Sequence, residues 1–182
     1  MNLKKFGLLV VGAILALVLS ACGEAEISKV DADSKGKETE KKDNEKKEKP
    51  AEQKLKIGES VNFDGLTITL NEARIEKGGE FDTPEKDKFI VVNITAENTS
   101  DEEQVVSSVM NIDLKDADGY SYNTTFLMEG IQAQFDGSIE AGGKLRGEIP
   151  FDVPDSDEYQ LHFGNPFKKG KAIWVIPASE LK

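Results

Sequence analysis

The sequence predicts an all-β domain, an antiparallel β-sandwich of about eight strands that occupies residues 55–182. Three observations support this fold class. From Leu55 onward, apolar residues alternate with polar ones at a period of two, as in strands that bury one face. Turns rich in Gly, Asp, Asn or Pro separate most of these segments. No segment shows a convincing amphipathic helical pattern.

The first 22 residues have the pattern of a secretory signal peptide. Lys4 and Lys5 form a short basic segment, and residues 6–19 form an apolar run broken only by glycines. That run has 14 residues, fewer than the ~20 that a membrane-spanning helix needs. The four residues Leu19-Ser20-Ala21-Cys22 resemble the bacterial lipobox. We therefore expect cleavage between Ala21 and Cys22, with a diacylglycerol attached to the Cys22 thiol.

Removal of residues 1–21 would leave Cys22 as a lipid anchor on the outer face of the cytoplasmic membrane, with the domain extracellular. The two acyl chains of a diacylglycerol supply the two hydrophobic signals that stable anchoring takes. The alternative is that Cys22 is a small residue near an ordinary cleavage site. Because the chain has a single cysteine, no intramolecular disulfide can form, and the core alone must stabilise the fold.

Residues 22–54 are predicted to be a lipidated cysteine followed by a disordered, charged tether. Residues 35–49 read KGKETEKKDNEKKEK, and the whole segment has no aromatic residue. Such a composition cannot bury enough apolar surface to offset its ordering entropy. A coil of this length spans about 30 Å, which would lift the domain off the membrane. A charged helix is the alternative, although Pro50 and the lack of an apolar stripe argue against it.

The clearest strand of the domain is residues 144–152. Leu145, Ile149 and Phe151 share one face with Gly147, and this face is predicted to be buried. The other face is predicted to be exposed to solvent, and it carries Lys144, Arg146, Glu148, Pro150 and Asp152. Since proline cannot donate to a ladder of hydrogen bonds, we expect this strand at a sheet edge or with a bulge.

Seven further strands complete the prediction. Residues 61–63 and 66–71 flank Asp64-Gly65, a strong hairpin signal. Residues 89–94 are apolar on both faces, as expected of a central strand. The remaining strands are expected at residues 109–114, with Met110, Ile112 and Leu114 inward, and at 120–126, 159–163 and 172–176. Residues 127–141 are predicted to hold a helical turn or a long loop.

Three segments resemble a domain family of unknown function found on many Gram-positive lipoproteins. They are residues 88–105 (KFIVVNITAENTSDEEQV), 116–120 (DADGY) and 141–154 (AGGKLRGEIPFDVP). The family is similar in fold to a secreted mycobacterial immunogenic antigen. The resemblance spans roughly residues 55–176 and implies an immunoglobulin-like sandwich. It implies no catalytic residues.

The charge of the domain excludes one class of partner. Residues 55–182 carry 12 basic and 24 acidic side chains. Non-specific nucleic-acid binding depends on clustered Lys and Arg that release counterions from phosphates. We therefore expect no nucleic-acid partner.

Residue types also limit the chemistry. The single histidine, His162, is expected on the solvent face of its strand, and no G-x-S-x-G motif is present, so a serine hydrolase is not predicted. One histidine and one lipidated cysteine cannot supply a zinc site. The residues Asp116-Ala117-Asp118-Gly119 resemble the start of a calcium loop, but Leu127 stands where its final glutamate belongs, so a hairpin turn is the simpler interpretation.

Two acidic turns, at residues 101–103 and 155–158, raise the alternative of carboxylate-based glycoside hydrolysis. Such sites sit in clefts with aromatic platforms, whereas the only tryptophan, Trp174, is flanked by Ile173 and Val175 and is expected in the core.

We therefore predict a lipid-anchored lipoprotein that presents a non-catalytic binding domain. Its partners would be the membrane, through lipid on Cys22, and an unidentified envelope protein or polymer. No enzyme activity, cofactor or metal is predicted. The alternatives are a calcium-responsive structural module and a carboxylate-based enzyme that acts on the cell wall.

Overall fold

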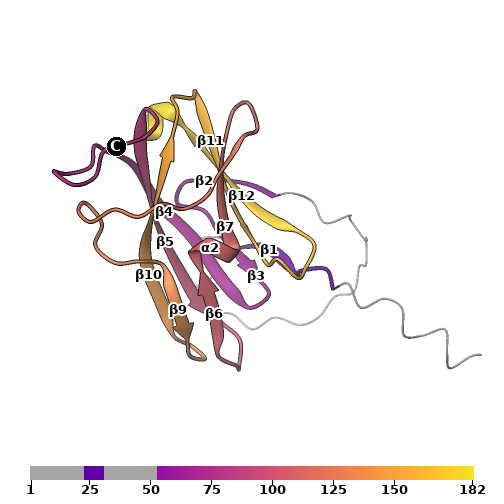
Figure 1. Ribbon diagram of the computed structural model, residues 1–182. Coiled ribbons are helices and arrows are strands. Elements are labelled where there is room, and N and C mark those ends of the chain that lie inside the picture. The colour runs from indigo at the N-terminus through magenta and orange to yellow at the C-terminus, as the bar shows by residue number, and fades with distance from the viewer. Residues whose placement is uncertain (1–22, 31–52) are drawn as a thin grey trace, which may run out of the picture.

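The computed structural model describes residues 23–30 and 53–182, which form two five-stranded sheets packed face to face (Figure 1). The first sheet has the order β1 (Ile27–Val30), β3 (Ser60–Phe63), β4 (Leu66–Glu76), β5 (Lys88–Asn98), β10 (Lys144–Val153). The second has the order β2 (Gln53–Lys56), β12 (Lys171–Pro177), β11 (Glu158–Gly164), β7 (Ile112–Asp116), β8 (Ser121–Tyr122). The strands β6 (Gln104–Ser107) and β9 (Asp136–Ile139) pair as a separate ribbon. Two short helical turns, α2 (Ser108–Asn111) and a 3-10 turn at Ala178–Glu180, complete the fold.

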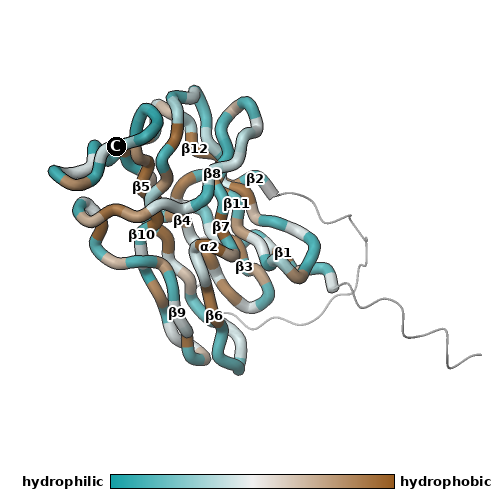
Figure 2. Tube along the Cα trace, in the orientation of Figure 1, coloured by the Kyte–Doolittle hydropathy of each residue, from teal (hydrophilic) through white to brown (hydrophobic). Residues whose placement is uncertain are grey.

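The predicted sandwich is confirmed, and its core lies between the two sheets. Figure 2 shows hydrophobic residues along the strands and polar residues in the outer turns. Phe151, Tyr159 and Trp174 are fully buried in this core. The indole Nε1 of Trp174 donates to the carbonyl of Glu59 at 2.9 Å, and the Tyr159 hydroxyl donates to the carbonyl of Pro154 at 2.6 Å. The two large polar rings are therefore buried with their donors satisfied.

Each of the eight expected strands has a counterpart in the structure, and the hairpin at Asp64-Gly65 is confirmed. The strand expected at residues 120–126 is too long: only Ser121–Tyr122 (β8) pairs, and residues 123–126 belong to a loop. Both turn residues have positive φ, 51° for Asp64 and 84° for Gly65, as a two-residue hairpin requires. The strand with Pro150 lies at the sheet edge beside β5, as expected. Four strands were not predicted: β1, β2, β6 and β9.

The predicted tether needs a correction at its first residues. Residues 27–30 are not disordered but form the edge strand β1, antiparallel to β3. Ala25 is buried, and the Asp64 amide donates to the Glu26 carbonyl at 2.9 Å. Because an edge strand needs one ladder of hydrogen bonds and few buried side chains, composition alone did not reveal it. Residues 31–52 lie outside the described part of the chain.

A second correction concerns residues 108–111, which form the helical turn α2 and not the start of a strand. Met110, expected inward, is exposed. The side-chain Nδ2 of Asn111 donates to the Gly164 carbonyl at 3.0 Å, and its Oδ1 accepts from the Ser107 backbone amide at 2.8 Å. The turn is thus held by side-chain hydrogen bonds that compete with strand pairing.

A long loop, residues 123–135, covers the outer face of the first sheet, and we call it the cover loop. Leu127 is buried against Phe89 and Val91, which form a second small hydrophobic cluster. The burial of β5 on both faces, expected from its sequence, has this cause. Phe135 enters the main core at the end of the loop.

Glu148 is buried beneath the cover loop, so its predicted position on a solvent face is wrong. Its carboxylate accepts hydrogen bonds from Arg74 Nη1 at 2.8 Å, Asn93 Nδ2 at 3.1 Å and the Gln132 amide at 3.0 Å. Arg74 also donates to the Gly130 carbonyl. One ion pair therefore connects two strands of the sheet with the cover loop. Alternation along the strand could not show that another segment covers the polar face.

This environment lowers the pKa of Glu148 to about 2. Burial alone would raise it, but the hydrogen bonds from Arg74, Asn93 and Gln132 outweigh that effect. Because the pKa is lower in the folded state than its ordinary value of 4.5, ionised Glu148 stabilises the fold above about pH 4.5. That contribution is lost as the pH falls from about 4.5 towards 2.

We predict that Glu148→Gln lowers the free energy of unfolding by about 3 kcal/mol at pH 7. The difference from the parent protein should shrink as the pH falls through this range. Denaturant unfolding at a series of pH values measures both quantities. The matched control is Glu97→Gln, which removes an exposed ion pair between Glu97 of β5 and Lys144 of β10 in the same sheet and should cost at most about 0.5 kcal/mol. Equal effects of the two substitutions would contradict the assignment of Glu148 as a buried structural anion.

Candidate functional site

An open groove lies between the loop that follows β4 and the segment that begins with β8. Its volume is about 520 Å³. The lining residues are Phe81, Asp82, Thr83, Glu85, Lys86, Phe89, Ser121, Tyr122, Asn123, Thr124, Thr125, Phe126 and Asp152. The cover loop supplies one wall, so the groove depends on how that loop is held to the sheet.

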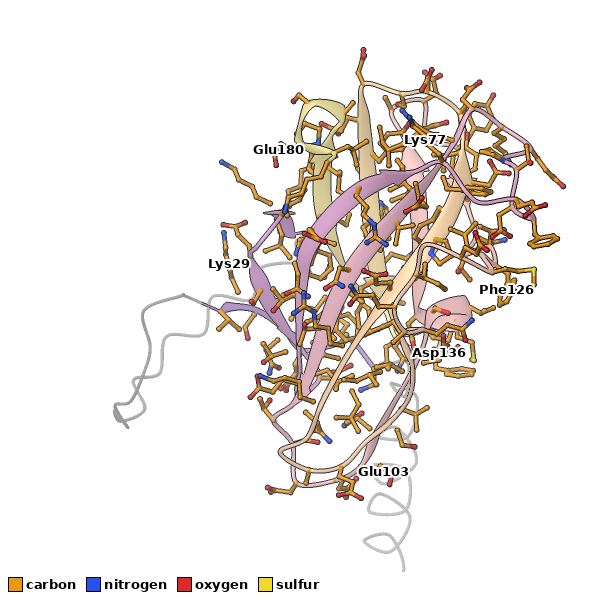
Figure 3. The ribbon with its side chains drawn as sticks, turned by 90° about the vertical axis from the view of Figure 1, so that its left-hand side faces the viewer. Lys29, Lys77, Glu103, Phe126, Asp136 and Glu180 are labelled. Carbon is orange, nitrogen blue, oxygen red and sulfur yellow. The ribbon has the colours of Figure 1, made fainter. Side chains whose placement is uncertain are left out.

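Three large apolar side chains face solvent here: Phe81 and Phe126 line the groove, and Met128 follows two residues after Phe126. Phe81 is 70% exposed, Phe126 65% and Met128 66%. We call these three residues the apolar rim. Phe126 projects from the surface in the side-chain view (Figure 3). Burying such side chains against a partner gains about 25 cal/mol per Å² of apolar area removed from water.

Two carboxylates hold the loops that carry the rim, one by joining the two loops and one by joining a loop to the sheet. Asp82 Oδ2 accepts from the amides of Met128 and Glu129 at 2.8 and 3.1 Å. Asp152, on β10, accepts from the amides of Glu85 and Lys86 at 2.8 and 3.1 Å. These acids act as clamps on backbone amides, and they fix the positions of Phe81 and Met128 relative to one another.

The Asp116 turn is the hairpin turn that the sequence favoured. Its carboxylate accepts from the Tyr120 amide at 2.9 Å and from the Tyr122 hydroxyl at 2.6 Å. The Tyr122 hydrogen bond lowers the pKa of Asp116, and it raises the pKa of Tyr122 to about 12. In residues 23–30 and 53–182, no group of three His, Cys, Asp or Glu side chains is arranged to hold a metal ion. The Asp116 oxygens instead organise the turn between β7 and β8.

The two acidic turns lie at opposite ends of one sheet. Residues 101–103 follow the end of β5 that pairs with Lys144, whereas residues 155–158 follow Val153 at the other end of β10. The strand between them has ten residues and spans about 30 Å. A hydrolytic pair of carboxylates lies within about 10 Å. The two turns therefore do not form such a pair.

His162 was expected to face solvent, and this prediction is wrong. The side chain is 7% exposed, on the central strand β11 between β7 and β12. Alternation placed it on a polar face, but that face of the second sheet is covered at this position. Trp174 lies in the core, as expected, and not in the groove.

The predicted anchor, Cys22, and the cleavage position between Ala21 and Cys22 lie outside the described residues. No helix in the described part of the chain is long and apolar enough to span a membrane.

The sequence does not predict the apolar rim. Phe126 was assigned to a strand, and Phe81 stands alone among charged residues. Two apolar residues on segments about 45 positions apart in the sequence form a surface only after folding. The one feature of the sequence that could have indicated this surface is Phe126-Leu127-Met128, three consecutive apolar residues next to the segment predicted as a helical turn or a long loop.

Solved structures share the fold. The "putative lipoprotein (ycdA)" of Bacillus subtilis matches with a TM-score of 0.53 and 16% identity over 64% of this chain. The match spans 37% of the length of that protein. The yjhA protein of Bacillus subtilis matches with a TM-score of 0.52 and 17% identity, over 70% of this chain and 98% of that one.

A secreted protein from Mycobacterium tuberculosis, MPT63, has a TM-score of 0.51 and 16% identity over 70% of this chain and its own full length. At these identities the likeness establishes the β-sandwich fold alone. No curated protein matches the chain. The sequence itself matches a family model over residues 55–173, which include most strands of both sheets and the residues that line the groove. The chain belongs to the family described as "Domain of unknown function (DUF4352)".

Proposed function

We propose that this protein is a lipid-anchored extracellular lipoprotein whose sandwich binds an envelope protein or polymer without catalysis. The observation that carries the binding role is the apolar rim: Phe81, Phe126 and Met128 are each at least 65% exposed, the two phenylalanines line the groove, and the Met128 amide is bound by Asp82 of the groove wall. Clusters of exposed apolar side chains on a soluble domain mark interaction sites. Aromatic residues and methionine are also enriched at interfaces.

The loops that form the rim are held in place before any partner binds. Asp82 and Asp152 fix four backbone amides, and the Glu148–Arg74 pair holds the cover loop. A surface that is ordered in advance loses less conformational entropy on binding. This arrangement is suited to a recognition surface built from loops on a rigid sandwich.

Support for a non-catalytic role comes from the carboxylates near the groove, which already accept hydrogen bonds from the protein. The carboxylates of Asp82, Asp152 and Asp116 are each occupied by amides or a hydroxyl, and Glu148 is an ion-paired anion beneath a loop. A general acid or base needs a pKa near the working pH and access to substrate. Glu148, with a pKa of about 2, lacks the first property.

Support for the extracellular location comes from the signal-peptide and lipobox pattern in residues 1–22. Two proteins of similar fold are named a "putative lipoprotein" and a secreted protein.

We predict that Cys22→Ala releases the protein from the membrane fraction or leaves unprocessed precursor. Cells grown with labelled fatty acid should incorporate label into the parent protein and none into this variant. Cys22→Ser is the matched control, because it keeps a small polar side chain but lacks the thiol that forms the thioether. Label in either variant would contradict the lipid anchor.

We predict that a photo-crosslinking amino acid at Phe126 captures a discrete partner on intact cells. The control is the same amino acid at Val105, which has 66% exposure against 65% for Phe126 but lies on β6, outside the groove. Added soluble domain should compete with the crosslink from position 126. Identical crosslinking patterns from both positions would argue against the apolar rim as the binding surface.

A further inference from the structure

The described residues begin on the surface of the sandwich, against the turn that joins β11 and β12. The amide of Ala25 donates to the carbonyl of Lys169 at 2.9 Å, and the amide of Lys169 donates to the carbonyl of Gly23 at 3.3 Å. Glu24 and Lys169 form a parallel β-bridge. Backbone hydrogen bonds therefore hold the chain to this turn from Gly23 onward.

Close packing reinforces the contact. A Cβ at Gly170 would lie 2.9 Å from Ile27 Cδ1, and φ of Gly170 is 105°, a conformation that favours glycine. The side chain of Ile27 thus packs directly on Gly170 of the turn. Any larger residue at position 170 would displace Ile27. The start of the described chain and the turn form one surface.

The turn itself, residues 165–171, has the composition of a membrane-contacting segment. It reads NPFKKGK, with three lysines and no acid, within a domain whose residues 55–182 carry twice as many acids as bases. Phe167 is 79% exposed. Aromatic residues flanked by lysines suit the boundary between acyl chains and anionic headgroups.

The turn is ordered and projects Phe167 outward. Asn165 Oδ1 accepts from the Phe167 amide at 2.9 Å, and the Asn165 carbonyl accepts from the Lys168 amide at 3.1 Å. Lys168 and Lys171 pair with Asp64 and Asp113 at 3.1 and 3.2 Å, so the turn is close to neutral with these neighbours. The surface is therefore amphipathic and not strongly repelled by anionic lipids.

Cys22 is bonded to Gly23, and neighbouring Cα atoms are about 3.8 Å apart. A diacylglycerol on Cys22 would therefore be attached to the residue next to Gly23, whose carbonyl is bound by the turn. The expected 30 Å tether does not lie between the lipid and the domain, because the sandwich already begins with the residues that follow Cys22.

We propose that the β11–β12 turn rests on the membrane surface, with Phe167 inserted among the lipids and Lys168 and Lys169 at the headgroups. The proposal rests on the lipid at Cys22 in the proposed function. A membrane contact at this turn would fix the orientation of the domain relative to the membrane. In Figure 1 the β11–β12 turn lies beside β1 on one side of the sandwich and the cover loop lies on the other, and in Figure 3 Lys29 of β1 and Phe126 are at opposite sides. The apolar rim would then face away from the membrane.

The test uses the full chain, processed in a Gram-positive host, in two single variants, Phe167→Trp and Phe126→Trp. Both positions hold exposed phenylalanines, and the native Trp174 is buried and common to both. Each variant is reconstituted in vesicles of phosphatidylglycerol and phosphatidylcholine with brominated acyl chains. Mass spectrometry of the N-terminal peptide establishes whether Cys22 carries lipid, and thermal melts establish that both variants fold as the parent does.

We expect the emission of Phe167→Trp to be shifted to the blue and quenched several-fold more than that of Phe126→Trp. Equal quenching, or none, with Cys22 lipidated would overturn the membrane contact and leave the anchor standing. If the peptide carries no lipid, the proposed anchor fails, and the membrane contact fails with it. Stronger quenching of Phe126→Trp would place the apolar rim on the membrane and would overturn the orientation.

Discussion

The buried ion pair between Glu148 and Arg74 is the interaction on which the outer face of this sandwich depends. It joins β4 and β10 across β5, and through Gly130 and Gln132 it holds the cover loop against the sheet. A charge buried this deeply is costly unless its lone pairs find donors, and here Arg74, Asn93 and Gln132 donate four hydrogen bonds to the carboxylate. The loop in turn buries Leu127 over Phe89 and Val91. The groove and its apolar rim exist because this loop is in place.

In our proposal, one side of the molecule contacts the membrane and the other binds a partner. One side combines the start of the described chain with the lysine-rich β11–β12 turn, next to the predicted lipid on Cys22. The other side carries Phe81, Phe126 and Met128 on loops clamped by Asp82. A lipoprotein with this arrangement would present its recognition surface outward without a long spacer. The acidic surface of the domain is consistent with a partner other than nucleic acid.

Much of the fold could be predicted from the sequence, because alternation identifies a strand whenever one of its faces is buried. Phe151 was assigned to the core on this basis and Trp174 from its apolar neighbours, and both lie there. The pattern failed where a second layer covers the polar face, as at Glu148 and His162, because alternation describes a single sheet and not what packs over it. Alternation also failed to predict β1, because this short edge strand is held by backbone hydrogen bonds to β3 and its own side chains are not buried. The apolar rim could not be predicted, because Phe81 and Phe126 lie on segments about 45 positions apart in the sequence and line one groove only after folding.

Amide hydrogen exchange of an Arg74→Met variant tests the central role of the ion pair most directly. This substitution keeps an unbranched side chain in place of the arginine stem but removes the donors to Glu148 and Gly130. We predict that the amide of Gln132, which donates to Glu148, exchanges at nearly the rate of an unprotected peptide, while the amide of Leu161 in β11 stays protected. If Gln132 remains as protected as in the parent protein, the ion pair does not hold the cover loop, and the account is contradicted.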